Sequence, residues 1–180
     1  HQGMKKILSN QAVKKFMHNR KAVLGLIIVC FLVLAVILIP IFMKLDPYTT
    51  DRAVGFNKAP CPGHLLGTDD VGRDLFARLL YGGRISLFVG IMSTIISVLI
   101  GIPLGLIAGY FRGIAETVIM RVADAFMSFP TMVLILVLVA VFGPSILTVT
   151  VVIGVLGWTA IAKLIYGNVL SIRELSLIHI

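Results

Sequence analysis

Three long runs without a charged side chain constrain this sequence most. They cover residues 22–43, 85–111 and 125–162 and contain no Asp, Glu, Lys or Arg. A helix rises about 1.5 Å per residue and the hydrocarbon core of a bilayer is about 30 Å thick, so roughly 20 apolar residues make one crossing. Hydrophobic residues are 58% of the chain and charged residues 13%. The runs therefore predict helices that lie in a membrane.

The third run is too long for a single crossing. Its 38 residues would form a helix of about 57 Å. Gly143 and Pro144 lie near its centre, and this residue pair favours a turn. We interpret the run as two spans, residues 125–142 and 145–162. Together with the first two runs, they predict an all-α, polytopic transmembrane protein with four spans.

The distribution of Lys and Arg predicts the orientation. Residues 1–21 carry six basic and no acidic residues, whereas the loop at residues 44–84 mixes six basic residues with five aspartates. The positive-inside rule places the N-terminal segment in the cytoplasm and the loop outside it. Residues 112–124 and 163–174 are then cytoplasmic. The net charge of +8 gathers beside the spans, which indicates contact with anionic membrane lipid and no binding of nucleic acid.

The end of the outer loop is predicted to form an amphipathic helix at about residues 70–81. Gly82 and Gly83 are expected to break this helix before the chain enters the bilayer. Aspartates at the start of a helix are usually caps, and no base, nucleophile or metal-ligand cluster accompanies them. We therefore predict no catalytic, cofactor or metal residues, so the chain is not expected to be an enzyme. His64 is expected to be solvated.

Two further residue patterns suggest contacts between helices. Gly101, Gly105 and Gly109 recur every four residues in the second run, and small residues at this spacing let helices approach closely in lipid. Arg121 and Asp124 are three residues apart and are expected to pair near the cytoplasmic face.

The spans contain no ionisable Asp, Glu, Lys or Arg. Carriers coupled to protons or sodium commonly place such side chains within their spans. If the protein moves a solute, the energy is therefore expected to come from another subunit.

An ordered series of motifs resembles the C-type permease subunits of bacterial dipeptide, oligopeptide and nickel ABC importers. The motifs are HLLGTDDVGRD (64–74), LYGGRISL (80–87), GLIAGY (105–110), IMRVAD (119–124), Phe129-Pro130, Gly157-Trp158-Thr159 and Val169-Leu170-Ser171. The resemblance covers roughly residues 20–174, and the order of the motifs makes it specific.

The resemblance implies a six-span subunit of a type I ABC importer in the bacterial inner (plasma) membrane, with both ends in the cytoplasm. Such a subunit forms a heterodimer with a second permease and receives its substrate from an extracytoplasmic binding protein. Two cytoplasmic ATPase subunits drive it and use the ATP and Mg, so this chain is expected to bind no cofactor. The resemblance also implies structural or subunit-contact roles for Gly67, Thr68, Asp69, Gly72, Arg73, Asp74, Gly82, Arg84, Ser86, Arg121 and Asp124.

The sequence departs from the family pattern at several points. Glu116 stands where Asp is usual, and Tyr166 where a basic residue is common. The family's Glu-Ala-Ala coupling segment, expected to begin within residues 163–174, and the last two spans are not found. Residues 175–180 resemble a translated sequencing adapter and are expected to be non-native, and residues 1–3 precede the first methionine.

These patterns predict a permease subunit for peptides or a related small solute such as nickel. Two alternatives remain, a secondary carrier and a small membrane anchor or assembly protein.

Overall fold

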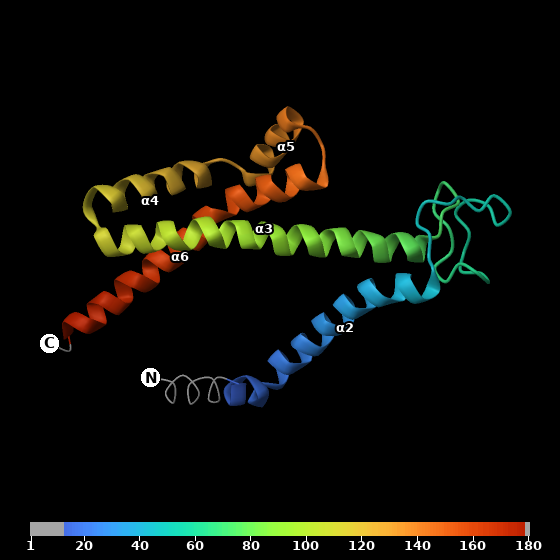
Figure 1. Cartoon of the computed structure of the whole chain (residues 1–180), viewed down its shortest axis with the longest axis horizontal. Helices are drawn as coiled ribbons and strands as arrows, with labels where there is room; N and C mark the ends of the chain where they lie inside the picture. The colour runs from blue at the N-terminus through green and yellow to red at the C-terminus, as the bar shows by residue number, and fades with distance from the viewer. Residues whose placement is uncertain (1–12, 179–180) are drawn as a thin grey trace. The chain divides into compact units, whose positions relative to one another are not determined.

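The residues that the structure describes are mostly helical, and one long loop joins α2 (Arg20–Met43) to α3 (Leu75–Phe111) (Figure 1). A computed structural model describes residues 13–178, and over these residues it contains isolated bridges but no β-strand. The chain divides into two compact units, one ending at Arg84 and the other beginning at Ile85. Residues 13–18 are helical, and the helices that follow are α2, α3, α4 (Gly113–Ser128), α5 (Thr131–Phe142) and α6 (Ile146–Ile178).

The predicted all-α membrane fold is confirmed. Among the described residues, α2, α3 and α6 are long and apolar enough to cross a membrane. The helices α4 and α5 pass the same test only as a pair, which would make a fourth span. Their axes are bent by 87°, so residues 125–142, predicted as the third span, do not form one continuous helix.

Helix α2 begins at a side-chain cap and ends at a left-handed residue. The Asn19 carboxamide oxygen accepts a hydrogen bond from the Ala22 N–H at 3.3 Å, which satisfies one free donor of the first turn. Lys44 ends the helix at φ +48°. Pro40 lies inside α2 and supplies no N–H, so the carbonyl of Val36 has no partner within the helix.

Helix α3 differs from its prediction at its first turns. The helix expected at residues 70–81 begins only at Leu75, because residues 67–74 form a tight loop with bridges from Thr68 to Asp74 and from Thr50 to Arg73. The expected break at Gly82 and Gly83 is wrong, since α3 runs unbroken to Phe111. Glycine weakens a helix by only about 1 kcal/mol relative to alanine.

Helix α4 occupies most of the segment expected to be a simple connection. Arg112, at φ +55°, and Gly113, at φ +62°, turn the chain from α3 into α4. Phe129 is extended (φ −91°, ψ 143°) before Pro130, which disfavours helical geometry in the residue that precedes it. The bend between α4 and α5 therefore follows from one proline.

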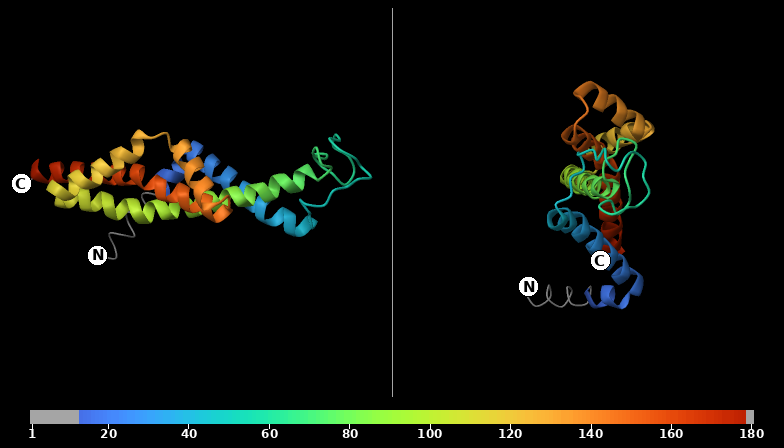
Figure 2. Two further views of the ribbon diagram at one scale, coloured as in Figure 1. Left: turned by 90° about the horizontal axis from the view of Figure 1, so that it is seen from above. Right: turned by 90° about the vertical axis from the view of Figure 1, so that its right-hand side faces the viewer.

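The second unit packs around α6, which contacts α3, α4 and α5 (Figure 2). Its buried core contains Ala123, Trp158 and Ala162, against which Ile100, Leu104 and Ile119 pack. Phe126 of α4 meets Trp158 edge to face, with ring centroids 6.3 Å apart. These contacts fix α4 and α6 against each other.

Candidate functional site

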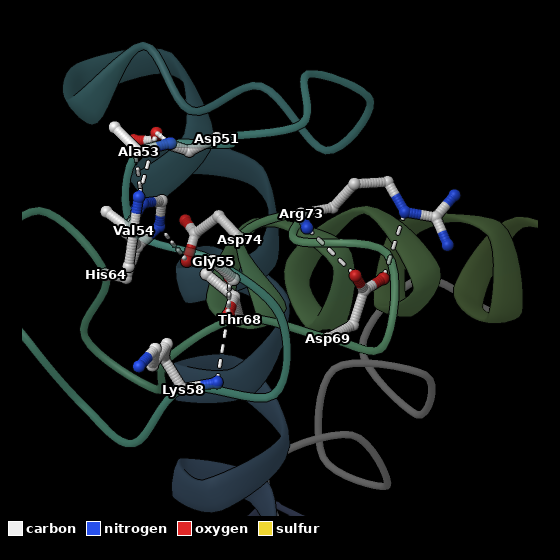
Figure 3. Close-up of polar contacts among 10 residues, drawn as sticks. All are labelled: Asp51, Ala53, Val54, Gly55, Lys58, His64, Thr68, Asp69, Arg73 and Asp74. Atoms are coloured by element: carbon white, nitrogen blue, oxygen red, sulfur yellow. Dashed lines mark hydrogen bonds and ion pairs between the residues drawn. The ribbon is translucent and has the colours of Figure 1, made fainter.

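A compact polar cluster folds the loop of the first unit onto the start of α3 (Figure 3). We call it the loop cluster, and it consists of Asp51, His64, Thr68, Asp69, Arg73 and Asp74. It brings together the residues of the 64–74 motif and adds Asp51, which the sequence did not single out.

Thr68 connects three parts of the loop. Its hydroxyl donates to the carbonyl oxygen of Gly55 at 2.8 Å and accepts from the N–H of Lys58 at 3.1 Å. The residue is 5% exposed. Because the hydroxyl both donates and accepts, valine could fill its volume but would leave two backbone groups without partners.

Asp69 is held by three N–H groups. Its carboxylate accepts from the N–H groups of Val71 at 2.9 Å and Arg73 at 2.8 Å, and from the Arg73 guanidinium at 2.9 Å. These bonds, above all that from the Arg73 backbone N–H, hold the pKa of Asp69 below its usual value. The loop is therefore ordered around an ionised carboxylate.

We expect the loop around Asp69 to loosen in acid. The pKa of Asp69 is lower in the folded loop than the value of 3.8 in the unfolded chain, so its ionised carboxylate stabilises the loop fully above pH 3.8. This stabilisation is lost as the pH falls through the folded-state pKa. Hydrogen exchange at the Arg73 amide, corrected for the intrinsic rate, should therefore rise as the pH falls below 3.8. Asp69→Asn should remove this dependence, whereas the exposed Asp70→Asn should keep it. Equal profiles for the wild type and Asp69→Asn would contradict the assignment.

His64 is not solvated, contrary to the expectation from sequence. Its side chain is only 13% exposed and lies between two carboxylates. The Nε2 atom is 3.4 Å from Asp51 Oδ2, and the Nδ1 atom is 3.4 Å from Asp74 Oδ1. The hydrogen bond to His64 is the main reason why the pKa of Asp51 is lowered. The other oxygen of Asp74 accepts from the Ala77 N–H at 3.3 Å and so caps α3.

Gly67 lets two loop segments touch through their backbones. It adopts φ +78°, and a β-carbon there would overlap the carbonyl oxygen of Lys58. The next residue holds this approach in place, because the Thr68 N–H donates a hydrogen bond to the Lys58 carbonyl oxygen at 3.1 Å. Gly72, at φ +80°, lies against Phe56 and Thr50.

Arg84 pairs with the carbonyl that Pro40 leaves free in α2. Its Nε donates to the Val36 carbonyl oxygen at 2.9 Å, and its Nη2 donates to the Ile37 carbonyl oxygen at 2.7 Å. Gly83 allows this approach, since a β-carbon there would lie 3.0 Å from Val36 Cγ2. The pair Gly83-Arg84 thus joins α3 to the proline site of α2 and does not end α3.

We expect the contribution of Arg84 to the free energy of unfolding to depend on Pro40. Arg84→Met should lower the free energy of unfolding by about 1.5 kcal/mol, because a charged donor to a backbone carbonyl is lost. In the Pro40→Ala variant, the new backbone N–H of residue 40 can donate to the Val36 carbonyl oxygen. Arg84→Met should therefore lower the free energy of unfolding by less in this variant than in the wild type. Unfolding in mixed detergent, followed by circular dichroism, measures both steps of the cycle. Equal costs in the two backgrounds would show that Arg84 does not compensate for the proline.

The three glycines predicted to pack helices lie directly against α6. A β-carbon at Gly101 would lie 2.6 Å from Ile161 Cβ, one at Gly105 2.6 Å from the Ala162 carbonyl oxygen, and one at Gly109 2.7 Å from Val169 Cβ. We call this contact the α3–α6 seam. Ser97, which the sequence analysis did not single out, extends it, because its hydroxyl donates to the Gly154 carbonyl oxygen at 2.8 Å. The available signal was that Ser97 is one of three serines in the apolar run at residues 85–111.

The remaining predicted residues do not join the loop cluster. Asp124 of α4 pairs with Lys163 of α6 at 2.5 Å, so its partner is not Arg121 as expected. Gly82 and Ser86 are exposed on α3. For all residues implied by the family series, a functional role stays a prediction.

The fold and the loop cluster define a polytopic α-helical membrane protein with one ordered polar loop. Two family models match its sequence: the N-terminal transmembrane domain of oligopeptide transport permease C at residues 8–60, and the binding-protein-dependent transport system inner membrane component at residues 101–179. The chain therefore belongs to the family of binding-protein-dependent transport permeases. The second match includes residues 175–179, and their suspected non-native origin stays a prediction.

Named relatives narrow the comparison to peptide permeases. The chain is 34% identical to the oligopeptide transport system permease protein OppC of Bacillus subtilis, over 94% of this chain and 56% of that protein. It is 34% identical to the dipeptide permease DppC of the same organism, over 92% of this chain and 52% of the relative. The chain is 38% identical to the glutathione permease GsiD of Pectobacterium atrosepticum, over 75% of this chain and 46% of that protein. The chain spans about half the length of these curated relatives.

Proposed function

We propose that the chain is part of the permease subunit of an ATP-driven importer for peptides. The supporting observation is the ordered pair of family matches, which together include the first apolar helix and most of the second unit. The named relatives transport oligopeptides, dipeptides and glutathione, which favours a peptide-like substrate over nickel.

The proposal includes partners and an orientation. A second permease would complete the solute path, two cytoplasmic ATPases would hydrolyse ATP with Mg, and a binding protein would deliver the substrate to the loop side. The charge pattern supports a cytoplasmic N-terminus and an outer loop at residues 44–84. The ordered loop cluster is then available as a contact surface for a partner subunit on that side. This chain would move with its partners and would itself bind no nucleotide.

A chimeric permease tests the proposal. The aligned segment of the Bacillus subtilis oligopeptide permease is replaced by this chain, and the chimera is expressed in a strain that lacks its own copy. Uptake of a labelled oligopeptide should return, and it should stop when ATP is depleted at a constant proton gradient. The intact permease and an empty vector are the controls.

Other outcomes would contradict the proposal. Uptake that follows the proton gradient and not ATP would indicate a secondary carrier. Correct membrane insertion of the chimera and assembly with the ATPases, without any uptake, would show that this segment does not line a peptide path.

A further inference from the structure

Two buried polar atoms of the loop cluster face each other without an assigned hydrogen bond. They are Nδ1 of His64 and Oδ1 of Asp74, 3.4 Å apart, and among the described residues they are the buried side-chain N and O atoms without a hydrogen-bond partner. The second ring nitrogen, Nε2, lies 3.4 Å from Asp51 Oδ2. The imidazole ring therefore lies between two carboxylates (Figure 3).

The protonation state of the ring decides whether both contacts are attractive. A neutral imidazole has one N–H donor and one nitrogen lone pair, whereas ionised carboxylates only accept. A neutral His64 would thus place a lone pair against one of the two carboxylates. The imidazolium has an N–H on each nitrogen and can donate to both. In the imidazolium, Nδ1 donates to the buried Oδ1 of Asp74 while Nε2 donates to Asp51.

We propose that His64 is a proton-dependent clamp, which as imidazolium ties Asp51 in the loop to Asp74 at the start of α3 and as neutral imidazole releases Asp51. Asp46 and Lys44 line the same pocket as His64, Asp51 and Asp74, and this pocket has a volume of about 320 Å³. Asp69 pairs with Arg73 and Arg78 instead.

The contact to Asp51 should open first. The Asp51 side chain is 44% exposed and can turn to water, whereas the Asp74 side chain is 11% exposed and is fixed by the Ala77 N–H. When the pH rises, Nε2 therefore gives its proton to solvent and Nδ1 keeps its own. The clamp is closed at acidic pH and opens in alkali, which is the opposite direction to the acid loosening around Asp69.

Hydrogen exchange of the full chain in lipid nanodiscs tests the clamp. At pH 8.5, amides of residues 51–55 should exchange about fivefold faster than at pH 5.5, after correction for the intrinsic rate, as expected for loss of a partly exposed ion pair. His64→Gln should remove this dependence. Asp51→Asn should remove it too, because the amide can donate to the neutral ring or accept from the charged one. The exposed Asp70→Asn, which removes the same charge, should retain it.

Nitrogen NMR of labelled histidine supplies a second readout. The His64 signals, assigned by their loss in His64→Gln, should show both nitrogens protonated at pH 5.5 and only Nδ1 protonated at pH 8.5. A neutral ring protonated at Nε2, or an exchange difference that persists in Asp51→Asn, would overturn the proposal. The Asp51→Asn variant keeps His64 and Asp74, so this test remains decisive even if His64→Gln disorders the loop.

Discussion

Gly67→Ala is expected to open the loop of the first unit. The added methyl group would overlap the Lys58 carbonyl oxygen, which cannot move without breaking its bond to the Thr68 N–H. The residue would also have to keep φ +78° with a β-carbon. Overlap and backbone strain together should destabilise the closed loop by about 3 kcal/mol. Hydrogen exchange or limited proteolysis of residues 44–74 measures the loss.

Gly63→Ala is the matched control for this change. Gly63 also has a positive φ, +92°, but a β-carbon there would meet nothing within 4 Å. Gly63→Ala should therefore destabilise the closed loop only through backbone strain, by about 1 kcal/mol. If both substitutions cost the same, the close approach to Lys58 does not hold the loop.

Gly105→Ile is expected to separate α3 from α6. A β-carbon at Gly105 would lie 2.6 Å from the Ala162 carbonyl oxygen and 2.8 Å from Ile165 Cβ. A branched side chain cannot fit without displacing a helix, so the free energy of unfolding should fall by about 3 kcal/mol. Fluorescence of Trp158, the single tryptophan and 6% exposed, reports this unit directly during unfolding in detergent.

Gly90→Ile adds the same side chain to the same helix. Gly90 is exposed and has nothing within 4 Å of its β-carbon position. Its replacement should leave the free energy of unfolding, followed by Trp158 fluorescence, nearly unchanged. It could raise this free energy slightly because isoleucine is a better helix former than glycine. Equal losses at both positions would show that the α3–α6 seam does not require glycine.

Hydrophobic periodicity was sufficient to predict the fold class, but not the course of the chain. The uncharged runs predicted α2 and α3 because every backbone group in lipid must be bonded within a helix. Run length alone could not reveal the 87° bend, which occurs at Pro130. Gly82 and Gly83 were misread because local propensity does not record that α2 packs against Gly83.

The loop cluster was predictable only in part. The motif at residues 64–74 indicated that its polar residues act together, and the structure does place them together. The sequence could not show that Asp51, 13 residues before His64, completes the arrangement, because that contact depends on the path of the loop. The Asp124 partner was missed for the same reason, since Lys163 is 39 residues away.

The contact between Arg84 and the proline site of α2 also bears on how the protein is made. When α2 leaves the ribosome, its Val36 carbonyl lacks both the N–H that Pro40 cannot supply and the guanidinium of Arg84, which is translated 48 residues later. An unsatisfied carbonyl is costly in lipid. The insertion machinery should therefore retain α2 until the beginning of α3 emerges, and release the two helices into the bilayer as a hairpin.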